Sequence, residues 1–234
     1  DHDGFHASDY PGIKDDSFDL IPMITQALAI KGEQEESDLR IIASAWTAPP
    51  WMKDIEAWYQ PPSPENSHTG YGGVLKPGYE SLYADYLLKY LDVYREQGIR
   101  IWGITPVNEP LGNSGQWESM HFTAESQKLF IRDHLGPRLA EPAYEDISLL
   151  IYDHNRDLLE TWMDCICSDP STAQYVCGAA VHWYESTFRV YEDVFDRVHA
   201  KYPHCAIIHT EGCIDNLGND APPGVLDPVG YRES

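Results

Sequence analysis

Residues 79–110 read YESLYADYLLKYLDVYREQGIRIWGITPVNEP, and this stretch decides the fold. Apolar side chains recur at helical spacing over residues 79–97, and Gly98 follows as a typical helix end. Residues 99–105 then form an almost uninterrupted apolar run, which is typical of a parallel strand covered on both faces. The sequence Asn108-Glu109-Pro110 comes shortly after. The stretch therefore predicts one helix–strand unit with a carboxylate at the carboxyl end of the strand.

The same alternation of apolar runs and segments of helical period continues on both sides of this unit. Four more apolar runs predict further parallel strands, at residues 39–45, 147–152, 176–181 and 206–209. Segments of helical period lie before and between them, at residues 18–30, 124–135, 157–167 and 189–201. The second of these segments begins after Thr123 and is expected to stop at Gly136 and Pro137. Alternating strands and helices predict an α/β protein with right-handed crossovers.

Two architectures are built from such units, an open doubly wound sheet and a closed (β/α)8 TIM barrel. None of the five predicted strands is followed by a Gly-rich phosphate loop, and polar or aromatic residues follow all five. Both observations favour the barrel. Because five strands do not close a barrel, we expect two strands before residue 1 and one after residue 234. Residues 1–234 are thus expected to be part of one catalytic domain.

Composition restricts the class of partner. The chain has 234 residues, of which 42% are apolar and 12% aromatic, enough for the core of one domain. It carries 38 acidic and 16 basic residues, a formal net charge of -22, which repels nucleic acid and anionic lipid. No run approaches the roughly 20 apolar residues of a membrane-spanning helix. We therefore expect a soluble protein that does not bind nucleic acid.

Metal and nucleophile motifs are not found in the sequence. The cysteines lack the paired spacings of a structural zinc site and are interpreted as buried thiols: Cys165, Cys167, Cys177, Cys205 and Cys213. Three histidines follow predicted strands without a matching carboxylate spacing: His154, His182 and His209. There is no G-x-S-x-G elbow and no H-E-x-x-H pair. The sequence therefore predicts neither a metal nor an organic cofactor.

Two glutamates follow predicted strands. Glu109 follows the strand at residues 99–105, and Glu211 follows the strand at residues 206–209. A carboxylate on each of two strand ends at a barrel mouth is what glycosidic cleavage requires. A lone loop glutamate would be an ordinary surface residue, but Pro110 ends strand pairing and Asn108 offers an amide to a sugar hydroxyl. The pair therefore predicts hydrolysis of a glycosidic bond.

Aromatic residues at strand ends are a second sign of a sugar site, because the C–H faces of sugar rings pack on Trp and Tyr. Trp46 follows the first predicted strand, and residues 182–184 (His-Trp-Tyr) follow the fourth. The loop at residues 59–78 is expected at the same end, facing substrate. A non-catalytic carbohydrate-binding barrel is the alternative from another class. It would keep the aromatic residues and lose a glutamate, whereas both glutamates are present here.

Four stretches together resemble glycoside hydrolase family 30, which contains glucosylceramidases and β-1,6-glucanases: ASAWTAPPWMK (43–53), VNEP (107–110), AVHWY (180–184) and TEGC (210–213). The resemblance runs from Leu20 to Cys213. It implies a (β/α)8 barrel in which the five predicted strands are strands three to seven. The family's other strands and its accessory β-sandwich fall outside these residues, so this piece alone is expected to be inactive.

The resemblance also implies residue roles. Glu109 resembles the general acid/base and Glu211 the nucleophile of a retaining mechanism, which requires a protonated Glu109 and an ionised Glu211. The implied substrate-site roles are bonding of the sugar 2-hydroxyl by Asn108, lining of the glycone pocket by Trp46, and flanking and orienting of Glu211 by His182 and Tyr184. The loop after Glu109 differs from that of glucosylceramidases. Those enzymes have a substrate-facing Tyr in this loop, whereas this chain has Gln116 and Trp117. Trp117 is therefore a candidate for the aglycone side.

The expected function is retaining hydrolysis of β-glucosides, and glucosylceramide-type molecules are the preferred candidate substrates. Endo-β-1,6-glucanase activity of the same family is the alternative. The partner is then a β-glucoside, either a glycolipid or a β-glucan. The substrate class and the acidity of the chain suggest an extracellular or lysosome-like compartment.

Overall fold

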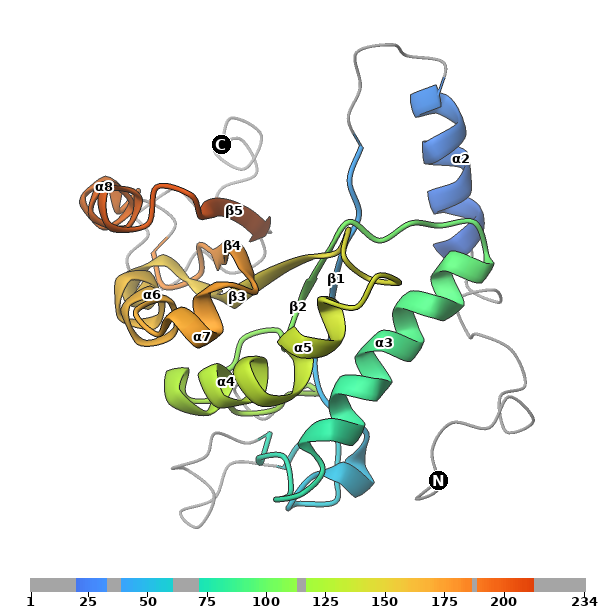
Figure 1. Cartoon of the computed structure of the whole chain (residues 1–234), viewed down its shortest axis with the longest axis horizontal. Helices are drawn as coiled ribbons and strands as arrows, with labels where there is room; N and C mark the ends of the chain where they lie inside the picture. Colours follow the sequence, from blue (N-terminus) through green and yellow to red (C-terminus); the bar gives the residue numbers. More distant parts are fainter. Residues whose placement is uncertain (1–19, 33–38, 61–71, 113–116, 187–188, 213–234) are drawn as a thin grey trace, which may run out of the picture.

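The computed structural model describes residues 20–32, 39–60, 72–112, 117–186 and 189–212 (Figure 1). Five strands form one parallel sheet: β1 Ile42–Ser44, β2 Gly103–Thr105, β3 Ser148–Asn155, β4 Val176–His182 and β5 Ala206–Glu211. Their order in space is the same as their order along the chain. A doubly wound sheet reverses its order at a switch point, so this progression is that of consecutive strands in a (β/α)8 barrel.

Helices connect the strands and follow one another along one side of the sheet (Figure 1). The α-helices are α2 Leu20–Gly32, α3 Glu80–Glu96, α4 Ala124–Phe130, α5 Gly136–Leu139, α6 Leu159–Cys167, α7 Pro170–Ala173 and α8 Glu192–Lys201. Shorter or wider turns complete the connections: η2 Pro50–Met52, the π-helical η4 Ile131–Leu135, and η5 Arg156–Leu158. Among the described residues, no helix has the length and apolarity needed to cross a membrane.

The hydrophobic core lies between the sheet and these helices. Residues 149–152 of β3 are all buried, as expected for a strand covered on both faces. On α3 the buried side chains Tyr83, Leu87, Leu91 and Tyr94 recur at spacings of three and four residues, which gives one apolar face. All five predicted strands and the helices predicted with them are therefore present.

Two helix boundaries differ from the sequence predictions. The helix starting at Ala124 does not stop at Gly136 and Pro137, but widens into η4 and continues as α5, which has Pro137 near its start. The last helix was expected from residue 189 but begins at Glu192, because Tyr191 adopts a left-handed φ of 63°.

The expectation about the cysteines is wrong, and the one about the loop at 59–78 falls mostly outside the described residues. The cysteines are not buried thiols: Cys177 is exposed, and Cys165, Cys167 and Cys205 are partly buried. Cys213 lies outside the described residues, as does most of the loop at 59–78.

The close pairing of β4 with β5 gives a stability prediction. A Cβ placed on Gly178 would lie 2.2 Å from the Ala206 carbonyl oxygen, so Gly178→Ala is expected to lower the free energy of unfolding by about 1–3 kcal/mol. Gly112→Ala is the control, since nothing lies within 4 Å of its Cβ position. Urea denaturation measures both. Equal stability of the two variants would contradict the close β4–β5 contact.

Candidate active site

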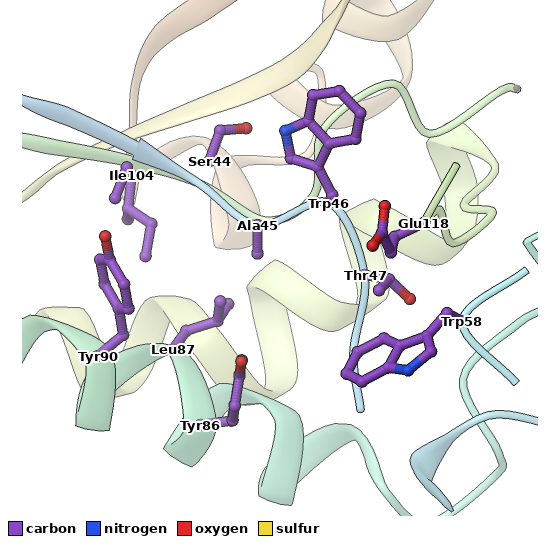
Figure 2. Close-up of a pocket in the computed structure, with 11 residues that line it drawn as sticks. Ser44, Ala45, Trp46, Thr47, Trp58, Tyr86, Leu87, Tyr90, Ile104 and Glu118 are labelled. Atoms are coloured by element: carbon purple, nitrogen blue, oxygen red, sulfur yellow. The ribbon is translucent and has the colours of Figure 1, made fainter. Parts of the chain in front are cut away.

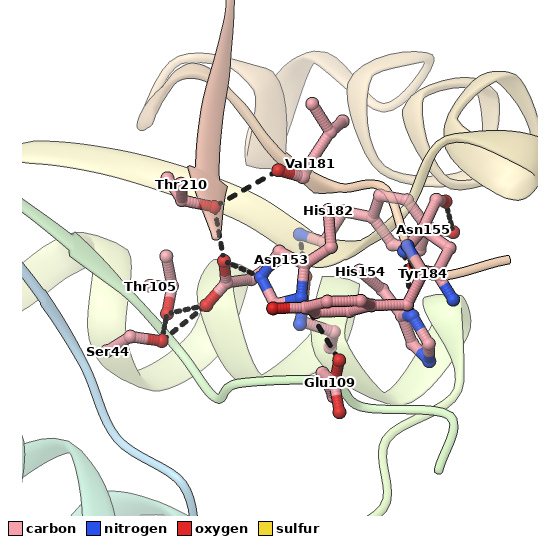
Figure 3. A network of polar contacts seen from close by, with 12 residues as sticks. Ser44, Thr105, Glu109, Asp153, His154, Asn155, Val181, His182, Tyr184 and Thr210 are labelled. Atoms are coloured by element: carbon pink, nitrogen blue, oxygen red, sulfur yellow. Dashed lines mark hydrogen bonds and ion pairs between the residues drawn. The ribbon is translucent and has the colours of Figure 1, made fainter. Parts of the chain in front are cut away.

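An irregularity in β3 puts Asp153 at the centre of the site. Tyr152 pairs with Ala180 and His154 with Val181, so Asp153 is an extra residue without a partner in β4. Tyr152 and Asp153 have φ angles of 76° and 60°, which are rare for residues other than glycine. Such a bulge re-aims a side chain. Here it directs the Asp153 carboxylate toward side chains of the other strands (Figure 3).

The Asp153 carboxylate binds one side chain from each of the other four strands. Its Oδ2 accepts hydrogen bonds from Thr105 Oγ1 at 2.9 Å and from Ser44 Oγ. Its Oδ1 accepts one from Thr210 Oγ1 at 2.8 Å and lies 3.0 Å from His182 Nε2. Burial works to raise the pKa of Asp153, but the hydrogen bonds from His182, Ser44 and Thr105 outweigh it and lower that pKa. This carboxylate, only 1% exposed, is therefore held ionised.

A second irregularity supplies Thr210. Val181 pairs with His209 and His182 with Glu211, so Thr210 is an extra residue in β5. The two extra residues, Thr210 and Asp153, bond to each other across the intervening strand. The bulges of β3 and β5 are thus parts of one polar network.

His182 links Asp153 to the first predicted catalytic glutamate. The ring is 0% exposed, with Nε2 toward Asp153 and Nδ1 3.1 Å from Glu109 Oε1. Burial works to lower the pKa of His182, but its hydrogen bonds to the two carboxylates outweigh this and raise the pKa to about 9. At neutral pH the ring is therefore an imidazolium that donates from both nitrogens.

Backbone contacts fix Glu109 between the ends of β1 and β3. Its φ is 45°, in the left-handed region, and its N–H donates to the Asp153 carbonyl at 2.9 Å. The N–H of Asn108 donates to the Ala45 carbonyl at 2.7 Å. Strained conformations of this kind persist where the surroundings over-determine them, as the two neighbouring strand ends do here.

Glu211 completes the cluster at the end of β5. One ligand atom from each of Glu109, His182 and Glu211 lies within 4.8 Å of the others. The two glutamates predicted from the sequence therefore lie together. The same atoms have metal-ligand spacing, and both His182 nitrogens face carboxylates, with Nδ1 toward Glu109 and Nε2 toward Asp153.

Burial and two neighbouring side chains act on the Glu211 carboxylate in opposite directions. Half-burial raises its pKa, while the charge of His182 and a hydrogen bond from the Tyr184 hydroxyl oppose that rise. The pKa of Glu211 lies above the ordinary value of a glutamate, because desolvation outweighs its two stabilising neighbours. Tyr184 thus has the predicted relation to Glu211. His182 also flanks Glu211, because one of its ring nitrogens lies within 4.8 Å of a Glu211 oxygen, while its Nδ1 bonds to Glu109.

The remaining predicted residues lie around this cluster. Asn108 is 3% exposed and lines a cavity of about 290 Å³ with Glu211 and Asp153. Trp46 is 42% exposed and lines a neighbouring cavity of about 310 Å³ between β1 and α3 (Figure 2). Its ring meets that of Trp117 edge-on, with the centroids 6.5 Å apart. Figure 2 also places Trp58 and Glu118 at this cavity.

Four residues of the network were not predicted as site residues: Asp153, Ser44, Thr105 and Thr210. The predicted third strand ended at Tyr152, whereas β3 extends to Asn155 and includes the aspartate. The sequence did contain a signal, because a charged residue, Asp153, directly follows the apolar run of a strand buried on both faces. A buried charge without partners is too costly, so such a residue needs hydrogen-bond donors around it.

Comparison with known proteins decides the family. A family model described as the glycosyl hydrolase family 30 TIM-barrel domain matches residues 2–222. This chain belongs to glycoside hydrolase family 30. The match confirms the predicted fold class, with β1 to β5 as consecutive parallel strands of the barrel.

Relatives and solved structures agree with this membership. The chain is 33% identical over 217 residues to lysosomal acid glucosylceramidase of Mus musculus, covering 90% of this chain and 39% of the relative. It superposes on the endo-beta1,6-glucanase BT3312 with a TM-score of 0.69 at 28% identity, covering 87% of this chain and 43% of that one. SrfJ from Salmonella typhimurium gives 0.71 at 26% identity, covering 87% and 41%. The chain thus spans about two fifths of the length of these proteins.

The network predicts an unusual histidine titration. The pKa of His182 is about 9, so its imidazole NMR signals should titrate near that pH. Asp153→Asn removes one of the two carboxylates that stabilise the imidazolium and should lower this pKa by more than one unit. The exposed Asp157 offers a control, Asp157→Asn, which should leave it nearly unchanged. A wild-type His182 that titrates near 6.5 would contradict the assigned network.

The same shift predicts a pH dependence of stability. Because the pKa of His182 is higher in the folded than in the unfolded chain, its contribution is complete below about pH 6.5 and is lost as the pH rises through about 9. Urea denaturation of the wild type should show this loss between pH 7 and 9, and Asp153→Asn should show a smaller one. A wild-type stability that rises across this interval would count against the imidazolium.

Proposed function

We propose that the protein containing this chain is a retaining β-glycoside hydrolase, with Glu109 as general acid/base and Glu211 as nucleophile. The supporting observation is the spacing of less than 4.8 Å between an oxygen of each carboxylate. Carboxyl groups about 5–5.5 Å apart permit direct attack on the sugar, whereas about 6.5–9.5 Å leaves room for a water and leads to inversion. The spacing favours double displacement, and residues 1–234 are proposed to be part of the catalytic domain.

In the first step the Glu211 carboxylate attacks the anomeric carbon while Glu109 gives its proton to the leaving oxygen. Glu109 thereby returns to the carboxylate form that pairs with the His182 imidazolium in the structure. In the second step Glu109 removes a proton from water, and that water displaces Glu211 from the sugar. The Tyr184 hydroxyl, which bonds Glu211, stabilises the carboxylate before attack and again on release.

The substrate is proposed to be a β-glucoside. A glycolipid of the glucosylceramide type comes first, because the mouse relative is a glucosylceramidase, and β-1,6-glucan cleavage is the alternative, since BT3312 is an endo-beta1,6-glucanase. Trp46 would line the glycone pocket and Asn108 would bond the 2-hydroxyl, while Trp117, whose ring meets Trp46, would face the aglycone. His182 is fully buried and so acts on the carboxylates rather than on the sugar. An extracellular or lysosome-like location fits these substrates.

Replacement of each glutamate should have a different kinetic signature in the protein as its gene encodes it. Glu211→Gln should lower kcat by at least about 10³-fold on every β-glucoside, because no covalent intermediate forms. Glu109→Gln should lower kcat/KM by about 10²–10⁴-fold on alkyl glucosides but much less on aryl glucosides, because kcat/KM reports the first step and an aryl leaving group needs no proton. It should lower kcat on both, because the second step loses its general base. Glu96→Gln, an exposed change at the end of α3, is the control. Near-normal turnover by Glu211→Gln would exclude the proposed nucleophile.

The stereochemical outcome separates the mechanisms. NMR during the first minutes of hydrolysis should show the β-anomer of the released sugar before mutarotation. The α-anomer as first product would establish inversion. Sugar binding by the wild type without any turnover would instead support the carbohydrate-binding barrel.

Substrate preference is tested by comparing kcat/KM on glucosylceramide in detergent micelles and on β-1,6-linked glucose oligomers. The proposal expects the higher value for glucosylceramide. A higher value for the oligomers would assign the chain to the glucanase branch and leave the catalytic pair unchanged.

A further inference from the structure

Two half-buried thiols meet far from the carboxylate cluster. Cys167 is the last residue of α6 and is separated from β4 by the short helix α7, and Cys205 directly precedes β5. Both therefore lie at the amino ends of strands, opposite the carboxyl ends that carry Glu109 and Glu211. The two side chains are hydrogen-bonded to each other.

Further hydrogen bonds, one helical turn before Cys167, keep the two thiols next to each other. Asp164 precedes Cys167 by one helical turn, and its Oδ1 accepts a hydrogen bond from the Tyr202 hydroxyl at 2.9 Å. The backbone carbonyl oxygen of Tyr202 in turn accepts a hydrogen bond from the backbone N–H of Cys205 at 3.0 Å. Lys201 adds a bond to Asp164 Oδ2 at 2.9 Å. The two thiols are thus held together by the packing of α6 against the end of α8.

The hydrogen bond makes the two thiols chemically unequal. It lowers the pKa of Cys205 against the opposing effect of burial, and together with burial it raises the pKa of Cys167. The thiolate is the nucleophilic form of cysteine, so Cys205 is the attacking sulfur and Cys167 the resolving one.

We propose that Cys167 and Cys205 are a disulfide-forming pair that is oxidised by low-molecular-weight disulfides such as glutathione disulfide. The Cys205 thiolate attacks one sulfur of glutathione disulfide, which breaks the S–S bond and releases one glutathione thiolate. The Cys167 thiol loses its proton to solvent and attacks Cys205 Sγ, which releases the second glutathione thiolate. Two protein thiols are oxidised and one glutathione disulfide is reduced to two glutathione molecules.

The cross-link would join the end of α6 to the start of β5 and enclose α7, β4 and α8. Closing a segment of this length restricts the unfolded chain and stabilises the folded one. Among the described residues, β4 is the only strand that pairs with β5 in the sheet, and this covalent tie would add a link from β5 to α6.

Other cysteines supply matched controls. Cys165 lies two residues before Cys167, but its Sγ donates toward Glu125 Oε2 of α4 at 3.6 Å. Cys177 is exposed on β4. Neither is placed to compete for Cys205, so Cys165→Ser and Cys177→Ser should leave the cross-link intact.

The test titrates the protein with glutathione buffers from fully reducing to fully oxidising, followed by acid quench, thiol alkylation and peptide mass spectrometry. Cleavage before Asp164 and Asp169 separates Cys167 from Cys177, and cleavage after Glu211 separates Cys205 from Cys213. In Cys165→Ser, a linked pair of these peptides identifies the bond without ambiguity. We expect it in the wild type and both controls, with oxidation raising Tm by about 5 °C or more.

Cys167→Ser and Cys205→Ser should lose both the linked peptide and the oxidation-dependent rise in Tm. The proposal is overturned if Cys205 stops at a mixed disulfide with glutathione in the Cys165→Ser protein. It is also overturned if Cys205 pairs with another cysteine, or if both thiols stay reduced in the oxidising buffer. The Cys165→Ser result decides the question even if the two loss variants fail to fold.

Discussion

The structure depends on one buried carboxylate that all five strands share. Asp153 accepts hydrogen bonds from Ser44 of β1, Thr105 of β2 and Thr210 of β5, and it faces His182 of β4. An ionised group with so little exposure is tolerated only with full compensation by donors. The five strand ends therefore have a common electrostatic reason to converge, besides the burial of their apolar faces.

The cluster of Glu109, His182 and Glu211 follows from this convergence. The negative charge of Asp153 keeps His182 protonated, and the imidazolium then attracts Glu109 and lies near Glu211. The bulge that turns Asp153 inward also exposes the carbonyl that receives the Glu109 N–H. One irregularity of β3 thus sets both the charge beneath the two glutamates and the backbone position of one of them.

The sequence predicted the elements and the meeting of the two glutamates, but not the network beneath them. Apolar runs and helix-ending residues located the five strands, because burial on both faces and helix capping are local signals. Glu109 and Glu211 were predictable because each follows a strand within a specific motif. Asp153 and Thr210 were not, because a bulge is a property of the pairing between strands. The hydrogen bond of His182 to Glu109 was not predicted for the same reason, because the positions of neighbouring strand ends decide which glutamate its Nδ1 meets.

The gathered carboxylates are proposed to act by double displacement through Glu211. Trapping the covalent glycosyl-enzyme intermediate separates this mechanism from its alternatives. A 2-deoxy-2-fluoro-β-glucoside with an activated leaving group slows the second step more than the first, so the glycosyl-enzyme accumulates. Peptide mass spectrometry of the inactivated wild-type protein then identifies the labelled side chain. The account predicts a single label on Glu211. A label on Glu109, or turnover of ordinary β-glucosides with no covalent label on either glutamate, would contradict it.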